Sequence, residues 1–193
     1  MRLQVEGDYA YVADSLGGVR IIDIRDPNKP SGEGFYSTFQ SAWSLQVVGN
    51  LVYVADDSAG LQVIDITDRA HPVRVGGYNT SGEARCVQVV SNYAYVADFS
   101  GGLQIIDVSN STNLVRAGSY PASRAAMGVC VTGGYAYLAD RDRGLEILSV
   151  SNLAHIERVG GCDTLGFASG VQVVGNYAYV ADGEEGLQII EVS

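Results

Sequence analysis

Aspartate recurs at one position of a strict 42-residue period. The phrase AYVAD, or a close variant of it, ends at Asp14, Asp56, Asp98, Asp140 and Asp182. A ring of carboxylates could bind a hard cation such as calcium. Equivalent atoms of packed sheets lie roughly 10 Å apart, however, which is too far for one shared ion. We therefore expect each Asp to accept N–H hydrogen bonds within the turn that it begins.

One of these loops remains a weak candidate for a metal site within a single repeat. The sequence DGEEG places three carboxylates close together along the chain, at Asp182, Glu184 and Glu185. Carboxylate oxygens suit hard cations, so this loop is the metal candidate that the sequence offers.

A second recurrent position varies freely in residue type. A constant alanine is followed by a different residue in each repeat, namely Trp43, Arg85, Met127 and Ser169, with Met1 at the same place in the first repeat. Trp and Arg are enriched at the energetic centres of binding interfaces. Since the repeat does not dictate these residues, we interpret them as ligand-binding candidates at the mouth of a channel. The alternative is that Trp43 fills the channel and Arg85 pairs with an acidic neighbour.

Catalytic patterns are absent from the sequence. It contains no GxSxG, Walker-type, HExxH or paired-cysteine zinc motif. His71 and His155 fall in loops two repeats apart, and Glu83 is the one acid in the variable segments. The cysteines, Cys86, Cys130 and Cys162, are expected to pack as small apolar groups. We expect no catalytic residue, no cofactor and no enzymatic activity.

Charge and hydropathy narrow the class of partner. The formal net charge of −10 repels phosphate backbones and anionic lipid, so nucleic acid and direct membrane insertion are not expected. No apolar run is long enough to span a bilayer, and the N-terminus shows no signal-peptide core. A protein, peptide or glycan ligand remains open.

The elements that must position these residues are short β-strands. Each complete period contains four runs of five to seven residues rich in Val, Ile and Tyr, as in LQVVG, YAYVAD, GLQIIDV and VRVGGY. Four antiparallel strands per repeat predict an all-β, five-bladed propeller, and the tyrosines are assigned to its core. The chain is then one domain with repeat units at approximately 1–42, 43–84, 85–126, 127–168 and 169–193, the last lacking its outer strand.

Three arrangements of the last blade follow. The ring could close by packing of blade 5 on blade 1, the chain could be part of a larger ring, or a partner chain could supply the missing strand. We favour the closed ring. In the closed ring the third strand of blade 5, within residues 187–193, is an edge at which another chain could pair. The glutamines at positions 4, 46, 88 and 172 are expected to satisfy backbone groups between blades.

The third-strand phrases resemble those of the LVIVD-repeat β-propellers. They read VRIIDIRDP at 19–27, LQVIDITD at 61–68, LQIIDVSN at 103–110, LEILSVSN at 145–152 and LQIIEVS at 187–193. Ser149 and Glu191 depart from the pattern by replacing its Asp. The resemblance implies the propeller fold and a secreted or cell-surface location, and it carries over no catalytic residue.

The function expected from the sequence is a non-catalytic binding or protein-interaction module with its ligand at the channel mouth. Two alternatives remain open. One is a structural or assembly unit, or a fragment of a larger propeller. The other is a glycan-active propeller enzyme, which would need two titratable groups facing one pocket.

Overall fold

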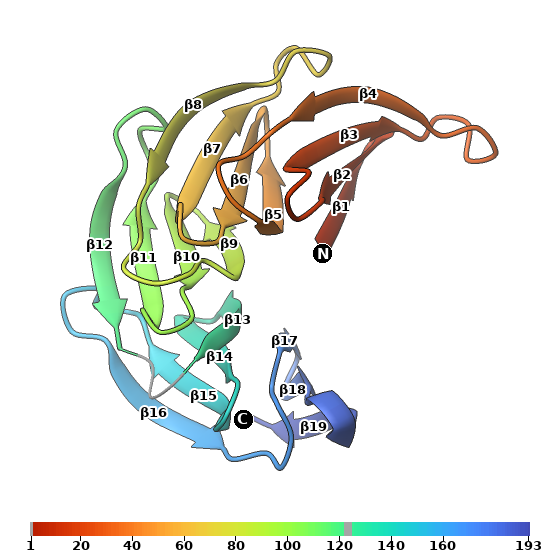
Figure 1. Cartoon of the computed structure of the whole chain (residues 1–193). Coiled ribbons are helices and arrows are strands. Elements are labelled where there is room, and N and C mark those ends of the chain that lie inside the picture. The colour runs from red at the N-terminus through yellow and green to blue at the C-terminus, as the bar shows by residue number, and fades with distance from the viewer. Residues whose placement is uncertain (1, 122–124) are drawn as a thin grey trace.

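The computed structural model describes residues 2–121 and 125–193. These residues form five antiparallel sheets in which sequential strands are neighbours. The sheets follow one another around an arc, with the first strand of each innermost and the last outermost (Figure 1). This is the predicted five-bladed propeller, and we number the blades 1 to 5 in chain order.

The first three blades have four strands each. Blade 1 contains β1 (Arg2–Glu6), β2 (Tyr9–Ala13), β3 (Val19–Asp23) and β4 (Ser31–Tyr36). Blade 2 contains β5 (Ala42–Val48), β6 (Leu51–Asp56), β7 (Leu61–Asp65) and β8 (Val73–Tyr78). Blade 3 contains β9 (Cys86–Val90), β10 (Tyr93–Ala97), β11 (Leu103–Asp107) and β12 (Val115–Tyr120).

Blade 5 differs from blade 4 in having three strands. Blade 4 contains β13 (Ala126–Thr132), β14 (Tyr135–Asp140), β15 (Gly144–Ser149) and β16 (Glu157–Cys162). Blade 5 contains β17 (Gly170–Val174), β18 (Tyr177–Ala181) and β19 (Leu187–Glu191), with the short 3₁₀ turn η1 (Gly183–Glu185) between the last two. None of the described residues belongs to a helix long and apolar enough to cross a membrane.

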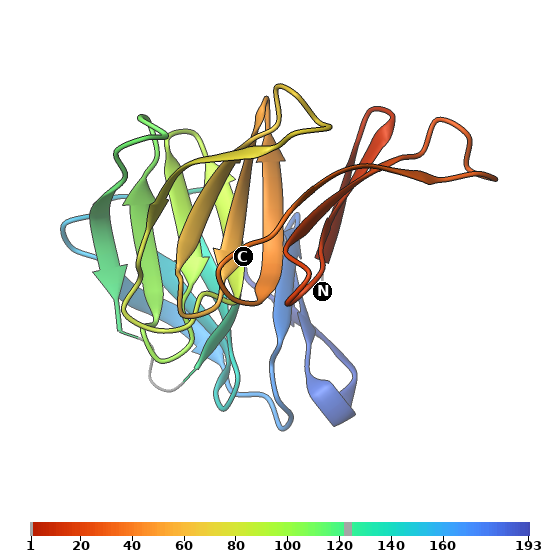
Figure 2. The ribbon, with the colours of Figure 1, turned by 45° about the horizontal axis from the view of Figure 1, so that its top comes forward.

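Each blade buries apolar side chains on both faces because it lies between two neighbours. In the interface of blades 1 and 2, Tyr11 and Ile21 pack against Val52 and Ile64. The same repeat positions form the three interfaces that follow along the chain. Figure 2 shows the sheets side by side, nearly face to face. The near-continuous apolar character of the strands is thus explained by burial on both sides.

Glutamine amides join the innermost strands of neighbouring blades. The side chain of Gln46 donates to the carbonyl of Val89 at 3.3 Å and accepts from the Val89 N–H at 2.6 Å. Gln4 makes the same pair of bonds to Val47, and Gln88 makes them to Val131. The predicted role of the glutamines, satisfaction of backbone groups between blades, is confirmed at these three positions.

Blade 5 does not close the ring by packing on blade 1, so that expectation was wrong. Leu3 and Val5 of blade 1 are 66% and 55% exposed, and Leu187 and Ile189 of blade 5 are 62% and 60% exposed. These are positions that the inner blades bury. Packing at each interface fixes the rotation from one blade to the next. Four such rotations leave the two end blades apart (Figure 1).

A matched pair of substitutions tests the amide bridges. Gln46→Leu leaves the backbone N–H of Val89 without its acceptor, and we expect a loss of about 1–3 kcal/mol of unfolding free energy. Gln172 occupies the equivalent position on the open face of blade 5 and is exposed, so Gln172→Leu should cost much less. Urea denaturation of both variants checks this. Equal losses would show that the bond to Val89 is not the cause.

Candidate ligand-binding site

The constant alanine before Trp43, Arg85 and Met127 is fixed by a bridge between blades. Ala42 pairs with Ser15, Ala84 with Asp57 and Phe99 with Ala126, each across the turn that follows the second strand of the preceding blade. Ala42, Ala84 and Ala126 are fully or almost fully buried, which leaves no room for a larger side chain. In blades 2 and 4 the residue after the alanine is the extra residue of a β-bulge, since the register shifts between Ala42 and Ser44 and between Ala126 and Gly128. A bulge re-aims the side chain of its extra residue.

The variable residues line one cavity. Trp43, Arg85, Met127 and Ser169 border a space of about 400 Å³ together with Arg2. The structure thus brings together all four residues that the sequence singled out. Met1, their counterpart in the first repeat, lies outside the described residues. Sequence reasoning missed Arg2, although it is the next residue in that repeat and could have been included with Met1.

Arg85 is at the centre of the contacts at this mouth. Its guanidinium lies 4.7 Å from the centre of the Trp43 ring and 5.3 Å from that of Phe99. It also forms ion pairs with Glu83 and, at 3.9 Å, with Asp57. The indole N–H of Trp43 donates to Asp57 at 3.0 Å. Trp43 is half-buried and is held as a wall of the cavity rather than filling it.

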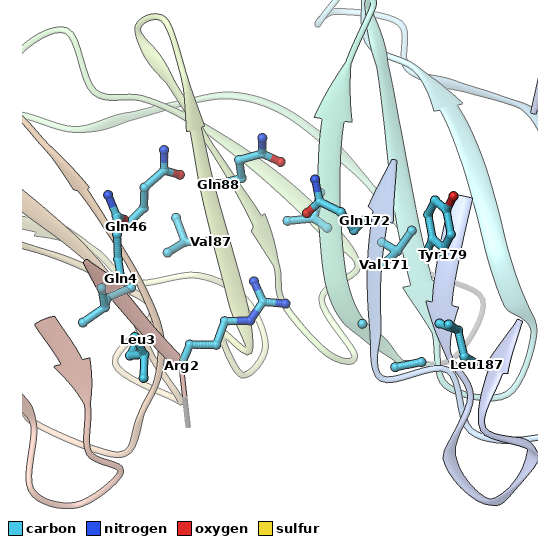
Figure 3. A pocket seen from close by; sticks show the side chains of 14 residues that line it. Arg2, Leu3, Gln4, Gln46, Val87, Gln88, Val171, Gln172, Tyr179 and Leu187 are labelled. Carbon is cyan, nitrogen blue, oxygen red and sulfur yellow. The ribbon is translucent and has the colours of Figure 1, made fainter. Parts of the chain in front are cut away.

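A larger cavity of about 600 Å³ extends along the axis of the arc. Gln4, Gln46, Gln88 and Gln172 line it, and Arg2 borders both this cavity and the mouth. Figure 3 shows these amides around the space and the Arg2 side chain extending into it. The channel therefore has a collar of amides below a mouth with aromatic, basic and apolar side chains.

The repeated aspartates bind loops of the protein, and the predicted bond within the aspartate's own turn is found at Asp140, which accepts from the N–H of Asp142 at 3.3 Å. At Asp56 and Asp98 the donors lie elsewhere. Asp98 accepts from the Thr80 hydroxyl at 2.5 Å and from the Gly82 N–H at 2.8 Å. Asp56 accepts from the backbone N–H groups of Phe39 and Gln40. These donors lie 16–18 residues upstream, in the connection from the fourth strand of one blade to the first strand of the next. Asp56 and Asp98 therefore join two loops, which the sequence did not predict.

The repeated aspartates differ in burial and in their partners. Asp56 and Asp98 are fully buried, and burial raises the pKa of both carboxyls against the opposing effect of their hydrogen bonds. Asp14 is partly exposed and pairs with Arg20. Asp56 and Asp98 hold loops, whereas the partner of Asp14 lies on strand β3.

The metal candidates are not gathered around a common point. Asp182 is buried and accepts from the Thr164 hydroxyl at 2.5 Å and the Gly166 N–H at 3.1 Å. Glu184 and Glu185 are exposed in η1. Within residues 2–121 and 125–193, no three His, Cys, Asp or Glu side chains cluster as metal ligands would.

The cysteines divide into two environments. Cys86 and Cys130 are buried, as expected of packing thiols, whereas Cys162 is exposed. Tyr78 and Tyr120, at the equivalent position of other blades, pack against the neighbouring core. The side chain of Cys162 is too short to do so, and the expectation that it packs as an apolar group was wrong.

The five repeats of the chain match the model of a known repeat family. The model of the LVIVD repeat matches residues 1–38, 40–80, 81–122, 123–164 and 165–193. The chain belongs to the LVIVD-repeat family. No curated protein matches this LVIVD-repeat chain in sequence.

Among solved structures, designed proteins share the fold of this LVIVD-repeat chain. The crystal structure of the computationally designed Ika8 protein matches 98% of the chain with a TM-score of 0.79 at 11% identity, and the chain spans 57% of the length of Ika8. The designed Ika4 protein matches 81% of the chain and is itself covered to 94%, with a TM-score of 0.65 at 11% identity. At this identity the likeness concerns the fold alone.

Trp43 is the single tryptophan of the sequence, so its fluorescence reports directly on the mouth. Arg85→Ala removes the cation over the indole ring, and we expect Trp43 emission to shift to longer wavelength. The loss of the stacked cation should cost about 0.5–2 kcal/mol of unfolding free energy. Arg143→Ala, at an exposed turn of blade 4, is the control and should leave the emission unchanged. An unchanged spectrum in Arg85→Ala would contradict the stacked geometry.

A pH titration tests the burial of Asp98. Its folded-state pKa is raised above 3.8, so its contribution to stability is complete below that pH and is lost as the pH rises through the folded value. Asp98→Asn cannot titrate. The unfolding free energy of the wild type relative to Asp98→Asn should therefore fall with rising pH above 3.8, by about 1.4 kcal/mol for each pH unit of the window. Urea denaturation across the acidic range measures this difference, and a constant value would refute the raised pKa.

Proposed function

We propose that this LVIVD-repeat propeller is a non-catalytic binding module that takes a protein, peptide or glycan ligand at its channel mouth. One observation carries the proposal. The repeat position that changes most in residue type supplies Trp43, Arg85, Met127 and Ser169, and all four border one cavity. The alanine beside them stays constant because it is buried between blades. Packing between blades thus requires the small alanine, whereas it does not constrain the type of the residue that follows.

The chemistry of the mouth suits a ligand that is mixed in character. Trp43 and Met127 offer apolar surface, and Arg2 offers guanidinium donors. The charge of Arg85 is balanced by Glu83 and Asp57, so the mouth is not a strongly cationic site. Concave sites with apolar walls and a few polar groups are the usual places for ligand binding. A peptide side chain or a sugar ring fits this description better than a phosphate group.

A binding role is preferred over catalysis because of how the carboxylates at the mouth are arranged. An acid–base mechanism needs two titratable groups directed at a substrate. Asp57 and Glu83 are instead directed at Arg85, and Asp57 also accepts from Trp43. These contacts position side chains of the mouth.

The exposed faces of the end blades support a second candidate, a structural or assembly unit. Leu3, Val5, Leu187 and Ile189 are apolar and more than half exposed. Such surfaces mark sites of association. This role is compatible with a ligand at the mouth, and it would appear as a mass that rises with protein concentration.

The binding proposal is tested with an array of glycans and a library of peptides, with Trp43 emission as the readout. Trp43→Ala should abolish binding of any ligand so found, measured by calorimetry. Its stability loss should stay below the ~3–5 kcal/mol typical of a fully buried aromatic residue. Phe35→Ala, at an exposed phenylalanine of β4, is the matched control and should bind normally. Full affinity in Trp43→Ala would place the site elsewhere.

A further inference from the structure

A small slot lies beside the channel mouth, between two loops of blade 5. It encloses about 120 Å³ and is bordered by Leu165, Gly166 and Phe167 of the connection from β16 to β17 and by Glu184 and Glu185 of η1. The connection and η1 lie side by side at one end of the blade (Figure 2). Pockets that enclose a whole ligand measure about 300–1,000 Å³, so this slot suits a single side chain.

The walls of the slot are fixed by contacts within the protein. The carboxylate of Asp182 accepts from the Thr164 hydroxyl and the Gly166 N–H, which joins the two loops. A methyl group built on Gly166 would lie 2.0 Å from the carbonyl oxygen of Asp182, so the close approach of the loops requires glycine there. The guanidinium of Arg141 lies over the Phe167 ring, 4.9 Å from its centre. The apolar wall is thus positioned without a ligand.

The exposure of the slot does not come from the open side of blade 5. In the other blades, which pack against a following neighbour, the position of Glu184 is also exposed, and its residues are Leu16, Ser58, Ser100 and Asp142. The position of Leu165 is likewise exposed at its counterparts Phe39 and Ser81. These loop positions therefore face solvent wherever the blade stands in the series.

The side chains of the slot are not used by the packing of the protein. Leu165 is 93% exposed and Phe167 is 56% exposed. Glu184 and Glu185 are exposed too, and neither carboxylate forms an ion pair or hydrogen bond with residues 2–121 or 125–193. The counterparts of Glu184 differ in type from blade to blade, so the fold does not require an acid there. The slot therefore combines two apolar side chains with two carboxylates that have no partner among the described residues.

This combination matches the side chain of lysine. Its four-carbon stem packs along apolar surface while the ammonium group at its end stays at the polar rim. The ammonium is a compact cation with three donors, which two separate carboxylates can bind. The formal net charge of −10 also attracts a cationic partner and repels an anionic one.

The slot is close to the mouth cavity along the chain. Phe167 borders the slot and Ser169 borders the mouth. An extended chain spans at most ~3.3–3.6 Å per residue, so the Cα atoms of these two residues lie within about 7 Å of each other. A peptide in the mouth can therefore place one of its next residues in the slot.

We propose that the slot binds a lysine side chain of a peptide whose adjacent residues occupy the channel mouth. Leu165 and Phe167 pack against the lysine stem, and Glu184 and Glu185 bind its ammonium group. The proposal rests on the binding function proposed above and narrows its ligand to a basic peptide.

A small probe tests the slot without a complete ligand. Nα-acetyl-lysine methylamide is titrated into the isotope-labelled whole protein, and the amide signals of Gly166 and Glu185 are followed by NMR. We expect saturable shifts of both signals. Nα-acetyl-norleucine methylamide has the same stem without the ammonium group and should bind at least about threefold more weakly, because it loses the attraction of the two carboxylates.

Three protein variants separate the contributions. The double variant Glu184→Gln with Glu185→Gln should bind the lysine probe at least about threefold more weakly and the norleucine probe unchanged. Leu165→Ser removes part of the apolar wall and should weaken both probes. Asp142→Asn is the matched control, since Asp142 is the exposed counterpart of Glu184 in blade 4, and it should bind both probes as the wild type does.

The slot and the mouth can fail separately. Trp43 does not border the slot, so Trp43→Ala should keep the full affinity for the lysine probe while it loses peptides that bind at the mouth. If a peptide binds in a Trp43-dependent manner but the lysine probe does not bind, the slot proposal is wrong and the mouth proposal stands. If the lysine probe binds but no ligand depends on Trp43, the mouth proposal is wrong and so is the adjacent placement of the peptide.

The remaining outcomes that overturn the slot concern selectivity. Equal affinity for the lysine and norleucine probes would show that the carboxylates take no part. An unchanged affinity in the double glutamine variant would show the same. An equal loss in Asp142→Asn and in the double variant would show that the probe is attracted by the acidic surface in general.

Discussion

The packing of one blade face against the next is the interaction on which the rest of the molecule depends. A single four-stranded sheet of this sequence is apolar on both faces and could not remain separate in water. Two neighbours cover it, and the apolar contact is supplemented by the bonds from Gln4, Gln46 and Gln88 to backbone groups of the following blade. These amides pin the register of the inner strands, which hydrophobic contact alone would fix only loosely. Stability in such a molecule is close to a sum over repeats and the interfaces between them.

The channel mouth follows from this packing rather than from a separate design. A bridge such as that between Ser15 and Ala42 holds the turn of one blade against the first strand of the next. The alanine of the bridge is buried, and the residue that follows it borders the mouth cavity. In this short stretch the fold requires the alanine, while the type of the next residue is free to vary. Arg85, at this position, contacts Trp43, Phe99, the carboxylate of Glu83 in its own segment and that of Asp57 in a neighbouring loop.

Much of the fold could be predicted because its signals are local and repeated. The 42-residue period, the strand-length runs and the hairpin turns predicted the blades. The position that varies between repeats singled out Trp43 and Arg85 as candidates. Two features depended on distant contacts and were missed. The partners of Asp98 lie in a loop 16–18 residues upstream, which the AYVAD phrase alone does not reveal. Closure depends on the angle between packed blades, and no residue pattern specifies that angle.

The repetition of one interface also bears on how the length of such a protein can change. Blades 1 to 4 each offer the next blade the same kind of surface, and each receives it with the same repeat positions. A unit copied within the gene would therefore find compatible neighbours on both sides, wherever it was placed in the series. The number of blades is then a quantity that duplication and deletion can alter in whole steps, while the chemistry of each mouth residue evolves by point substitution.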